Sequence, residues 1–194
     1  MESDNAHKTL LRISKEKDFD LLEKYLQESE PVEINLSALP LVEYLSSVVV
    51  SQQLSTKAAK TIWSRVHPII NAHTNYQNLE TELHSAGLSK SKANYVIGLI
   101  NNLKLSSLQR SDLKELSNIE FENLLSANKG IGPWSVQMAR MFFLGDTDVM
   151  PINDLGIKHA HEYFFNEHEM SEKFYEPFRP WRTYLSLLMW KSLS

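Results

Sequence analysis

Apolar residues recur at intervals of three and four along almost the whole chain, and this spacing constrains the fold more than any other feature. It is the period of an α-helix with one buried face, whereas a half-buried strand alternates apolar and polar residues. The β-branched run Val48-Val49-Val50 is the one stretch that resembles a strand, and its neighbours have helical spacing. We therefore expect an all-α protein.

Pro and Gly residues between the apolar segments mark where the helices end. One such break is expected at His67-Pro68, because a proline inside a helix removes a backbone donor. The chain should therefore fold into a bundle of about ten short helices. Their expected bounds are residues 19–28, 41–51, 57–67, 74–86, 90–103, 111–115, 120–128, 133–144, 155–165 and 180–193.

The composition excludes several kinds of protein. The chain has 194 residues and no cysteine, which excludes a disulfide framework, a zinc finger and a Cys-ligated iron–sulfur cluster. No apolar run approaches the roughly 18 residues of a membrane span, so we expect a soluble intracellular protein without a membrane partner. The net charge is −4, but residues 41–110 carry seven Lys and Arg against three Asp and Glu. A polyanionic partner should face this middle segment.

The stretch from residue 124 to residue 135 is the most informative one, because an apolar helix runs into a turn with two glycines and restarts at a proline. Gly130 and Gly132 allow the backbone to approach a ligand closely, and Pro133 suits the first turn of a helix. The unpaired N–H groups of the new helix and the charge of Lys129 together favour a phosphate. By spacing alone, an ordinary αα-hairpin explains the pattern equally well.

Five motifs, in order along the chain, resemble those of the helix-hairpin-helix DNA glycosylases, and within them the alkylpurine branch typified by 3-methyladenine DNA glycosylase II. The resemblance covers most of the chain. It is carried by Val48-Val49-Val50-Ser51-Gln52-Gln53-Leu54-Ser55, Gly87-Leu88-Ser89, Lys129-Gly130-Ile131-Gly132-Pro133-Trp134, Asn153-Asp154-Leu155-Gly156 and Arg179-Pro180-Trp181-Arg182-Thr183-Tyr184.

The resemblance implies a single glycosylase domain over residues 1–194, folded as a two-lobed helical bundle with a helix-hairpin-helix motif. One lobe would hold residues from about 41 to 144, with the hairpin at 128–134. The other would hold residues from about 8 to 40 together with 148–194. DNA is expected in a cleft between the two lobes.

Asp154 is the residue to which the resemblance assigns the chemistry. Cleavage of an N-glycosidic bond builds positive charge on the sugar, and a fixed carboxylate stabilises such a transition state. The carboxylate can also orient or deprotonate the attacking water. Without the resemblance, Asp154 is simply an N-cap for the helix that begins at Leu155, and both roles can coexist. Asn153 departs from the glycine that is common before this aspartate in the family.

Trp134 occupies the position at which bifunctional relatives resembling endonuclease III carry a lysine that forms a Schiff base with the sugar. The resemblance therefore implies hydrolysis without strand cleavage, which leaves an abasic site. A tryptophan in a base pocket can stack on a flipped base, and a cationic alkylpurine adds a cation–π attraction. By resemblance, Trp181 borders the same pocket. Core packing is the alternative for both side chains.

The loop Gln52-Gln53-Leu54-Ser55 is expected to contact DNA beside the flipped base. Leu54 would insert into the gap in the base stack as an apolar wedge, while its polar neighbours would bond base edges or the opposite strand. A plain helix-capping sequence is the alternative. The full set of expected DNA contacts is Gln52, Gln53, Leu54, Ser55, Lys57, Lys92, Lys129, Gly130, Ile131, Gly132 and Ser135.

These expectations define a monomeric, monofunctional glycosylase of base excision repair that flips alkylated purines of the 3-methyladenine type out of double-stranded DNA. No cofactor and no metal are expected, because His159, His161 and His168 lack the spacing of a metal site. Resemblance to eukaryotic members implies a nuclear location. Two alternatives stay open: a homologue with weak or no catalysis that binds and distorts damaged or abasic DNA, and a helical module for a protein partner.

Overall fold

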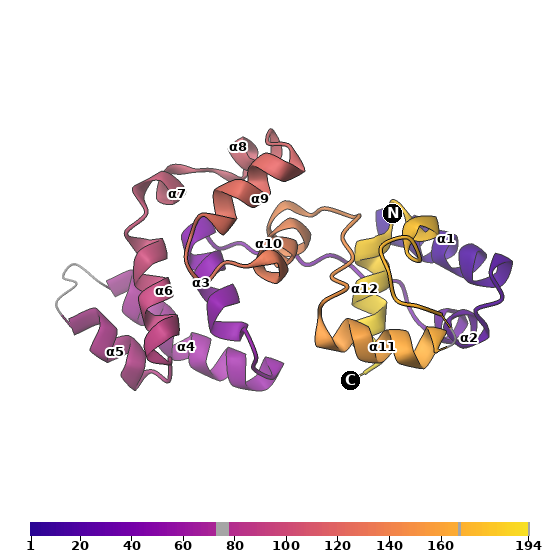
Figure 1. Ribbon diagram of the computed structural model, residues 1–194, viewed down its shortest axis with the longest axis horizontal. Helices are drawn as coiled ribbons and strands as arrows, with labels where there is room; N and C mark the ends of the chain where they lie inside the picture. Colours follow the sequence, from indigo (N-terminus) through magenta and orange to yellow (C-terminus); the bar gives the residue numbers. More distant parts are fainter. Residues whose placement is uncertain (73–77, 167, 194) are drawn as a thin grey trace. The chain divides into compact units, whose positions relative to one another are not determined.

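The protein is built from helices that group into two compact units (Figure 1). The structure is a computed structural model that describes residues 1–72, 78–166 and 168–193. Unit 1 comprises Met1–Leu36 and Arg140–Ser194, and unit 2 comprises Ser37–Ala139. No described residue lies in a strand, so the all-α prediction is confirmed. Within the same residues, no helix is long and apolar enough to cross a membrane.

The described part of unit 1 contains four α-helices, and that of unit 2 contains eight. Unit 1 holds α1 (Glu2–Glu16), α2 (Asp20–Glu28), α11 (Leu155–Phe165) and α12 (Arg182–Lys191), with a π-helix, η2 (Arg140–Leu144), and a 3-10 helix, η3 (Glu176–Phe178). Unit 2 holds α3 (Leu41–Ser51), α4 (Thr56–Ala72), α5 (Leu79–Ser85), α6 (Lys90–Ile100), α7 (Leu103–Ser107), α8 (Arg110–Lys114), α9 (Asn118–Ser126) and α10 (Pro133–Ala139).

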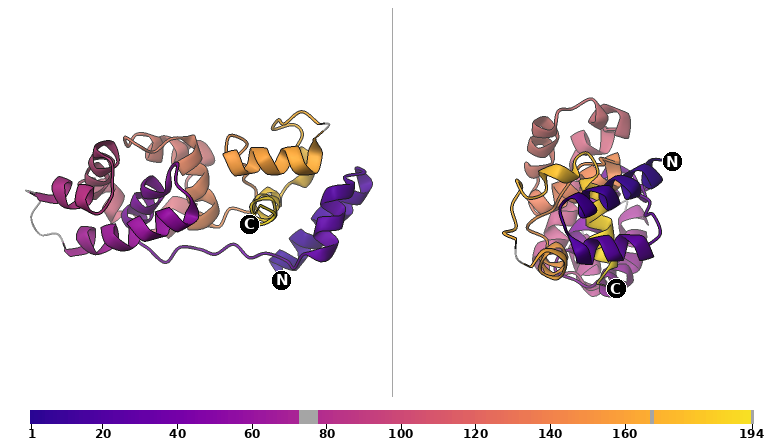
Figure 2. Two further views of the ribbon diagram at one scale, coloured as in Figure 1. Left: turned by 90° about the horizontal axis from the view of Figure 1, so that it is seen from below. Right: turned by 90° about the vertical axis from the view of Figure 1, so that its right-hand side faces the viewer.

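Unit 1 has one apolar core to which all four of its α-helices contribute. Within this unit, α1 packs on α2, and α11 packs on α12 (Figures 1 and 2). Aromatic rings fill the core, and the ring centroids of Phe19 and Phe165 are 5.0 Å apart. Tyr175 is fully buried, and its hydroxyl oxygen lies 2.8 Å from His161 Nδ1. The core therefore fixes α11 and α12, the helices on which the candidate site is built.

Unit 2 is built around α3, which packs against α4, α6, α7 and α10. Val48, Val49 and Val50 are buried on α3, so the strand-like run of the sequence is helical, as its neighbours indicated. The Tyr44 hydroxyl reaches from α3 to α10, where it donates a 2.7 Å hydrogen bond to the carbonyl oxygen of Met138. Burial raises the pKa of Tyr44, so the hydroxyl stays protonated and remains a donor.

Several predicted helix bounds differ from those in the structure. α4 continues through Pro68 to Ala72, so the break expected at His67-Pro68 is wrong. Pro68 has no N–H to donate to the carbonyl oxygen of Ser64, one turn earlier. Both residues are exposed, so water can donate a hydrogen bond to that oxygen instead. The helix expected over 133–144 is α-helical only to Ala139 and continues as the π-helix η2. Residues 74–77 of the helix expected over 74–86 lie outside the described residues, and α5 begins at Leu79.

α1 and α7 have no counterpart among the predicted helices. The first residues of α1 are polar, which hides the helical pattern behind them. Ala6, Leu10 and Ile13 are nonetheless spaced four and three residues apart, and all three are buried on one face. This spacing is the signal from which α1 could have been predicted.

Candidate functional site

Asp154 is the N-cap of α11, and it follows the loop that runs from Gly145 to Asn153 in unit 1. Its carboxylate oxygen Oδ1 accepts two hydrogen bonds, one from the backbone N–H of Ile157 at 3.0 Å and one from Trp190 Nε1 at 2.8 Å. The first bond confirms the N-cap role that the sequence indicates. The second comes from α12, so two elements together orient the half-buried carboxylate.

One face of α12 holds the loop that precedes α11. Thr183 Oγ1 accepts a hydrogen bond from the N–H of Val149 at 3.0 Å and donates one to the carbonyl oxygen of Asp146 at 2.7 Å. One turn further along, Ser186 Oγ lies 3.3 Å from the carbonyl oxygen of Val149. Thr183, Ser186 and Trp190 are three and four residues apart, so they lie on the same face of the helix. The position of the loop is therefore set by α12.

A cluster of charged side chains anchors the same loop. Asp148 Oδ1 lies 2.6 Å from Arg182 Nε, and Asp148 Oδ2 lies 2.7 Å from Arg179 Nε. Burial raises the pKa of Asp148, but the hydrogen bonds and charges of the two arginines outweigh this effect, so its pKa is lowered overall. Asp148 therefore stays ionised at neutral pH and pairs with the buried Arg182.

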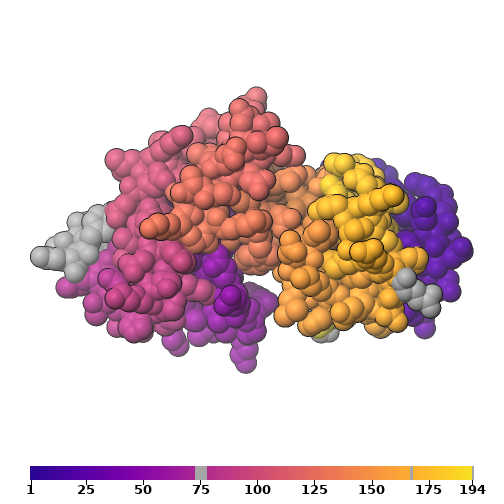
Figure 3. Space-filling view, viewed as in Figure 1, coloured from indigo at the N-terminus to yellow at the C-terminus, as the bar shows by residue number. Residues whose placement is uncertain are grey.

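A separate group of predicted functional residues lies in unit 2, in the hairpin between α9 and α10. Gly130 has a φ of +89°, and a Cβ there would lie 2.4 Å from Tyr95 Cδ2, so the fold itself requires glycine. A Cβ on Gly132 would meet no heavy atom within 4 Å. Lys129 is exposed beside the two glycines, and the chain around residue 130 reaches the surface on the face shown in Figure 3. The fold thus explains the first glycine and leaves open space at the second.

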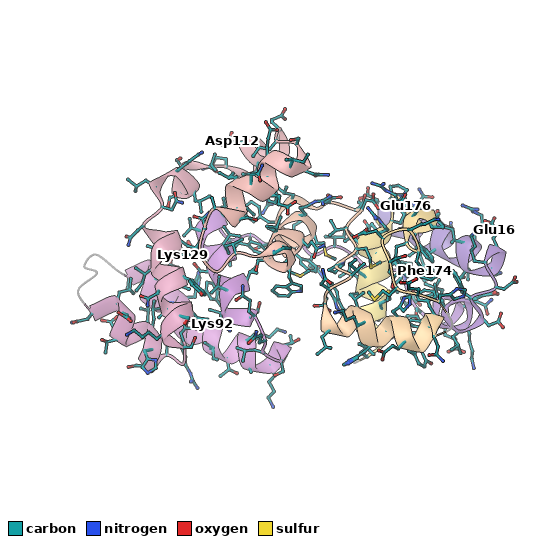
Figure 4. All side chains as sticks on the ribbon, viewed as in Figure 1. Glu16, Lys92, Asp112, Lys129, Phe174 and Glu176 are labelled. Atoms are coloured by element: carbon teal, nitrogen blue, oxygen red, sulfur yellow. The ribbon has the colours of Figure 1, made fainter. Side chains whose placement is uncertain are left out.

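The loop after α3 is joined to this hairpin by Gln52. Its Nε2 donates hydrogen bonds to the carbonyl oxygen of Gly130 at 2.8 Å and to Ser135 Oγ at 3.0 Å. Lys92, which Figure 4 labels, lies on α6. Its Nζ donates to the carbonyl oxygens of Val50 at 2.8 Å and of Gln52 at 2.7 Å. Its positive charge at the C-terminus of α3 is favourable, although burial lowers the pKa of Lys92. The structure therefore brings four of the predicted DNA-contact residues, Gln52, Lys92, Gly130 and Ser135, into one hydrogen-bonded network.

The other predicted contacts divide into exposed and buried side chains. Gln53, Leu54 and Ser55 are exposed at the tip of the loop, and Gln53 has a φ of +58°, which is rare for a residue with a side chain. Ile131 is 5% exposed and Ser135 is 1% exposed. For the two buried residues, a contact with DNA is thus confined to backbone groups.

The three tryptophans that concern the site have different surroundings. Trp134 is half-buried near the start of α10. Trp181 packs against the core of unit 1, with its ring 5.8 Å from that of Tyr184 between centroids. Trp190 contacts Asp154, a role that the sequence analysis missed because an aromatic residue on the last helix is equally explained by packing. The sequence signal that could have indicated this role is Gly156, because helix propensity disfavours glycine so close to the start of a helix.

The described residues contain no group of three His, Cys, Asp or Glu side chains that could hold a metal ion. His161 is a core residue, 4% exposed, and its ring nitrogens lie 2.8 Å from the Tyr175 hydroxyl and 2.9 Å from the carbonyl oxygen of His168. Its polar atoms are therefore engaged within the protein.

Comparison with known proteins supports the family resemblance that the sequence motifs indicate. The family model described as HhH-GPD superfamily base excision DNA repair protein matches residues 46–182. DNA-3-methyladenine glycosylase 1 of Schizosaccharomyces pombe is 32% identical over 163 residues, which cover 77% of this chain and 71% of that protein.

Two solved structures share the fold. A DNA-3-methyladenine glycosidase from Bacillus halodurans has a TM-score of 0.72 at 25% identity. The matched residues cover 96% of this chain and 88% of that chain. The 3-methyladenine DNA glycosylase Mag1 of Schizosaccharomyces pombe, in complex with abasic DNA, has a TM-score of 0.77 at 23% identity. The matched residues cover 97% of this chain and 96% of that chain. The chain therefore belongs to the HhH-GPD superfamily of base excision DNA repair proteins.

Proposed function

We propose that this protein is a DNA glycosylase that removes alkylated purines of the 3-methyladenine type from double-stranded DNA and leaves an abasic site. The observation that carries the proposal is the geometry of Asp154 in a chain of this family. Two N–H donors hold one carboxylate oxygen at 3.0 and 2.8 Å, so the group is oriented before any substrate binds. The choice of substrate is supported by relatives whose names specify 3-methyladenine.

The chemistry follows from the charge that develops during bond cleavage. As the bond between base and sugar breaks, the sugar becomes cationic, and a fixed carboxylate lowers the free energy of this transition state. The same carboxylate can accept a proton from the attacking water. A cationic alkylpurine leaves as a neutral base and needs no strong general acid. One carboxylate, that of Asp154, is therefore sufficient for the hydrolytic step.

The hairpin and the neighbouring loop are the proposed DNA-binding elements. Open space at Gly132 allows a phosphate to approach the backbone, and the exposed Lys129 supplies a positive charge. Leu54, which is 39% exposed at the loop tip, is the proposed wedge. Lys57 is exposed on α4 and is a proposed phosphate contact. Lys92 already donates to two carbonyl oxygens, and for it we propose a role in supporting the loop.

We further propose that the reaction is hydrolysis without cleavage of the DNA strand. Trp134 has no amine that could form a Schiff base with the sugar, and its indole offers a face on which a flipped base can stack. Trp181 stays a prediction as a residue that borders the base pocket. We also propose a nuclear location, which the resemblance to eukaryotic members implies.

The test is release of free methylated base from duplex DNA treated with dimethyl sulfate, for the wild type and for Asp154→Asn. Asparagine is also a good N-cap residue, so the variant keeps the fold and loses only the charge. We expect base release to fall by at least about 100-fold. Binding to a duplex that contains an abasic site, measured in parallel, should stay close to that of the wild type.

The other outcomes point to other roles. Full activity in Asp154→Asn would show that Asp154 is only a cap. Absence of base release by the wild type, together with firm binding to the abasic duplex, would favour a damage-binding homologue without catalysis. Absence of any salt-dependent DNA binding would favour a module for a protein partner.

A further inference from the structure

Gly156 stands two residues after Asp154, in the first turn of α11, where helix propensity by itself favours alanine over glycine. A Cβ at this position would lie 2.9 Å from Trp190 Cδ1 and 3.1 Å from Trp190 Nε1. It would also lie 3.1 Å from Asp154 Oδ1. These separations are too short for packed side chains, so the Trp190 indole occupies its place only because residue 156 has no side chain.

The indole is supported on another side by the π-helix. Phe142 of η2 and Trp190 have ring centroids 6.3 Å apart, with an angle of 30° between the ring planes. A π-helix shifts side chains relative to a regular α-helix, and such turns are frequent at functional sites. Trp190 thus has neighbours in η2 and in the first turn of α11, which restrict where its N–H can point.

From this geometry we propose that Trp190 is a positioning residue for Asp154 and that Gly156 is the opening that admits its indole. The inference rests on the proposed glycosylase function. The indole N–H donates a hydrogen bond and cannot accept one, so it favours the ionised carboxylate as its partner. It also holds Oδ1 from a direction different from that of the Ile157 N–H. A displacement of the carboxylate by about 1 Å can lower a rate by as much as 100-fold.

The experiment compares Trp190→Phe, which keeps an aromatic ring and loses the N–H donor, with Gly156→Ala, which displaces the indole. In both variants we expect kcat for base release to fall by about 10- to 100-fold. Binding to an abasic-site duplex should change by less than about threefold, since neither residue is a proposed DNA contact. Trp63→Phe is the matched control, because the Trp63 ring lies 4.9 Å from that of His67 within α4, between centroids. This variant should release base at the wild-type rate.

A second measurement reads the hydrogen bond directly. The indole ¹⁵N–¹H resonance of Trp190 is identified by its absence from the spectrum of Trp190→Phe. We expect this resonance to move in Asp154→Ala and in Gly156→Ala and to stay in place in Trp63→Phe. This readout does not depend on enzymatic activity.

The outcomes separate this inference from the proposed function. A folded Trp190→Phe with wild-type kcat would overturn the positioning role, and so would a loss of kcat that only matches a loss of folded protein. An indole resonance of Trp190 that does not move in Asp154→Ala would contradict the hydrogen bond. If the wild type released no base but the Trp190 indole resonance moved in Asp154→Ala, the glycosylase function would be refuted, and the positioning role with it. The hydrogen bond between Trp190 and Asp154 would still be supported.

Discussion

Gln52 Nε2 donates a 2.8 Å hydrogen bond to the carbonyl oxygen of Gly130, across 78 residues of sequence. This bond joins the loop that follows α3 to the hairpin that precedes α10. The two segments carry most of the predicted DNA contacts of unit 2. They therefore form one supported surface in the folded unit.

Replacing Gln52 by alanine should weaken this surface. Gln52→Ala removes the donor to a partly buried carbonyl oxygen, and we expect a loss of about 1–3 kcal/mol in the free energy of unfolding. Affinity for an abasic-site duplex should fall as well, because the loop is released from the hairpin. Urea unfolding and fluorescence anisotropy measure the two effects. Gln53→Ala is the control, since Gln53 is exposed and should leave stability unchanged; equal stability of the two variants would contradict the proposed link.

The two hairpin glycines should respond differently to alanine. Gly130→Ala places a Cβ 2.4 Å from Tyr95 Cδ2 and forces a positive φ on alanine, so we expect a marked fall in the melting temperature. Gly132→Ala meets open space and should keep the wild-type melting temperature while it weakens DNA binding. Unchanged DNA affinity in a folded Gly132→Ala would show that no phosphate approaches the backbone there.

Two lysines should differ in the salt dependence of DNA binding. Lys129→Met removes an exposed charge beside the hairpin, and the slope of log affinity against log salt should fall by about 1. Lys92→Met removes the donor to the carbonyl oxygens of Val50 and Gln52, which should cost stability and leave the slope at its wild-type value. Binding isotherms at several salt concentrations test both. A smaller slope for Lys92→Met, at unchanged stability, would identify Lys92 as a phosphate contact.

Asp148 should make stability depend on pH in the acid range. The bonds from Arg182 and Arg179 overcome the effect of burial and lower the pKa of Asp148 below its usual 3.8. The resulting stabilisation is complete above the pKa of the unfolded chain and disappears as pH falls through the lower pKa of the folded protein. Asp148→Asn should therefore cost about 2–3 kcal/mol at pH 7 and less at pH 3.

Urea unfolding at the two pH values tests this difference. The matched control is Glu176→Gln, because the pair that Glu176 forms with Arg179 at 3.6 Å is exposed. An exposed pair contributes less than about 1 kcal/mol. An equal cost of Asp148→Asn at pH 7 and pH 3 would show that the loop is not held by the ionised carboxylate.

Several elements could be predicted because their causes are local. The bounds of α3 and α11 agree with the expected ranges, since apolar spacing and flanking breakers determine them. The N-cap bond of Asp154 joins it to a residue three positions later, so sequence alone suggests it. The wrong break at Pro68 has a non-local cause, because a proline is tolerated where the freed carbonyl faces water. Exposure of one helix face is decided by what the rest of the unit covers.

What the sequence by itself determined is the all-α class, the hairpin with its two glycines, and membership of the glycosylase family, because helical periodicity and ordered motifs are properties of short segments. What only the tertiary structure decided is which groups support the candidate site. Trp190 and Asp154 are 36 residues apart, and the Lys92 amine lies against carbonyl oxygens 40 and 42 residues away. Contacts of this range depend on how helices pack, and no local pattern of residues specifies them.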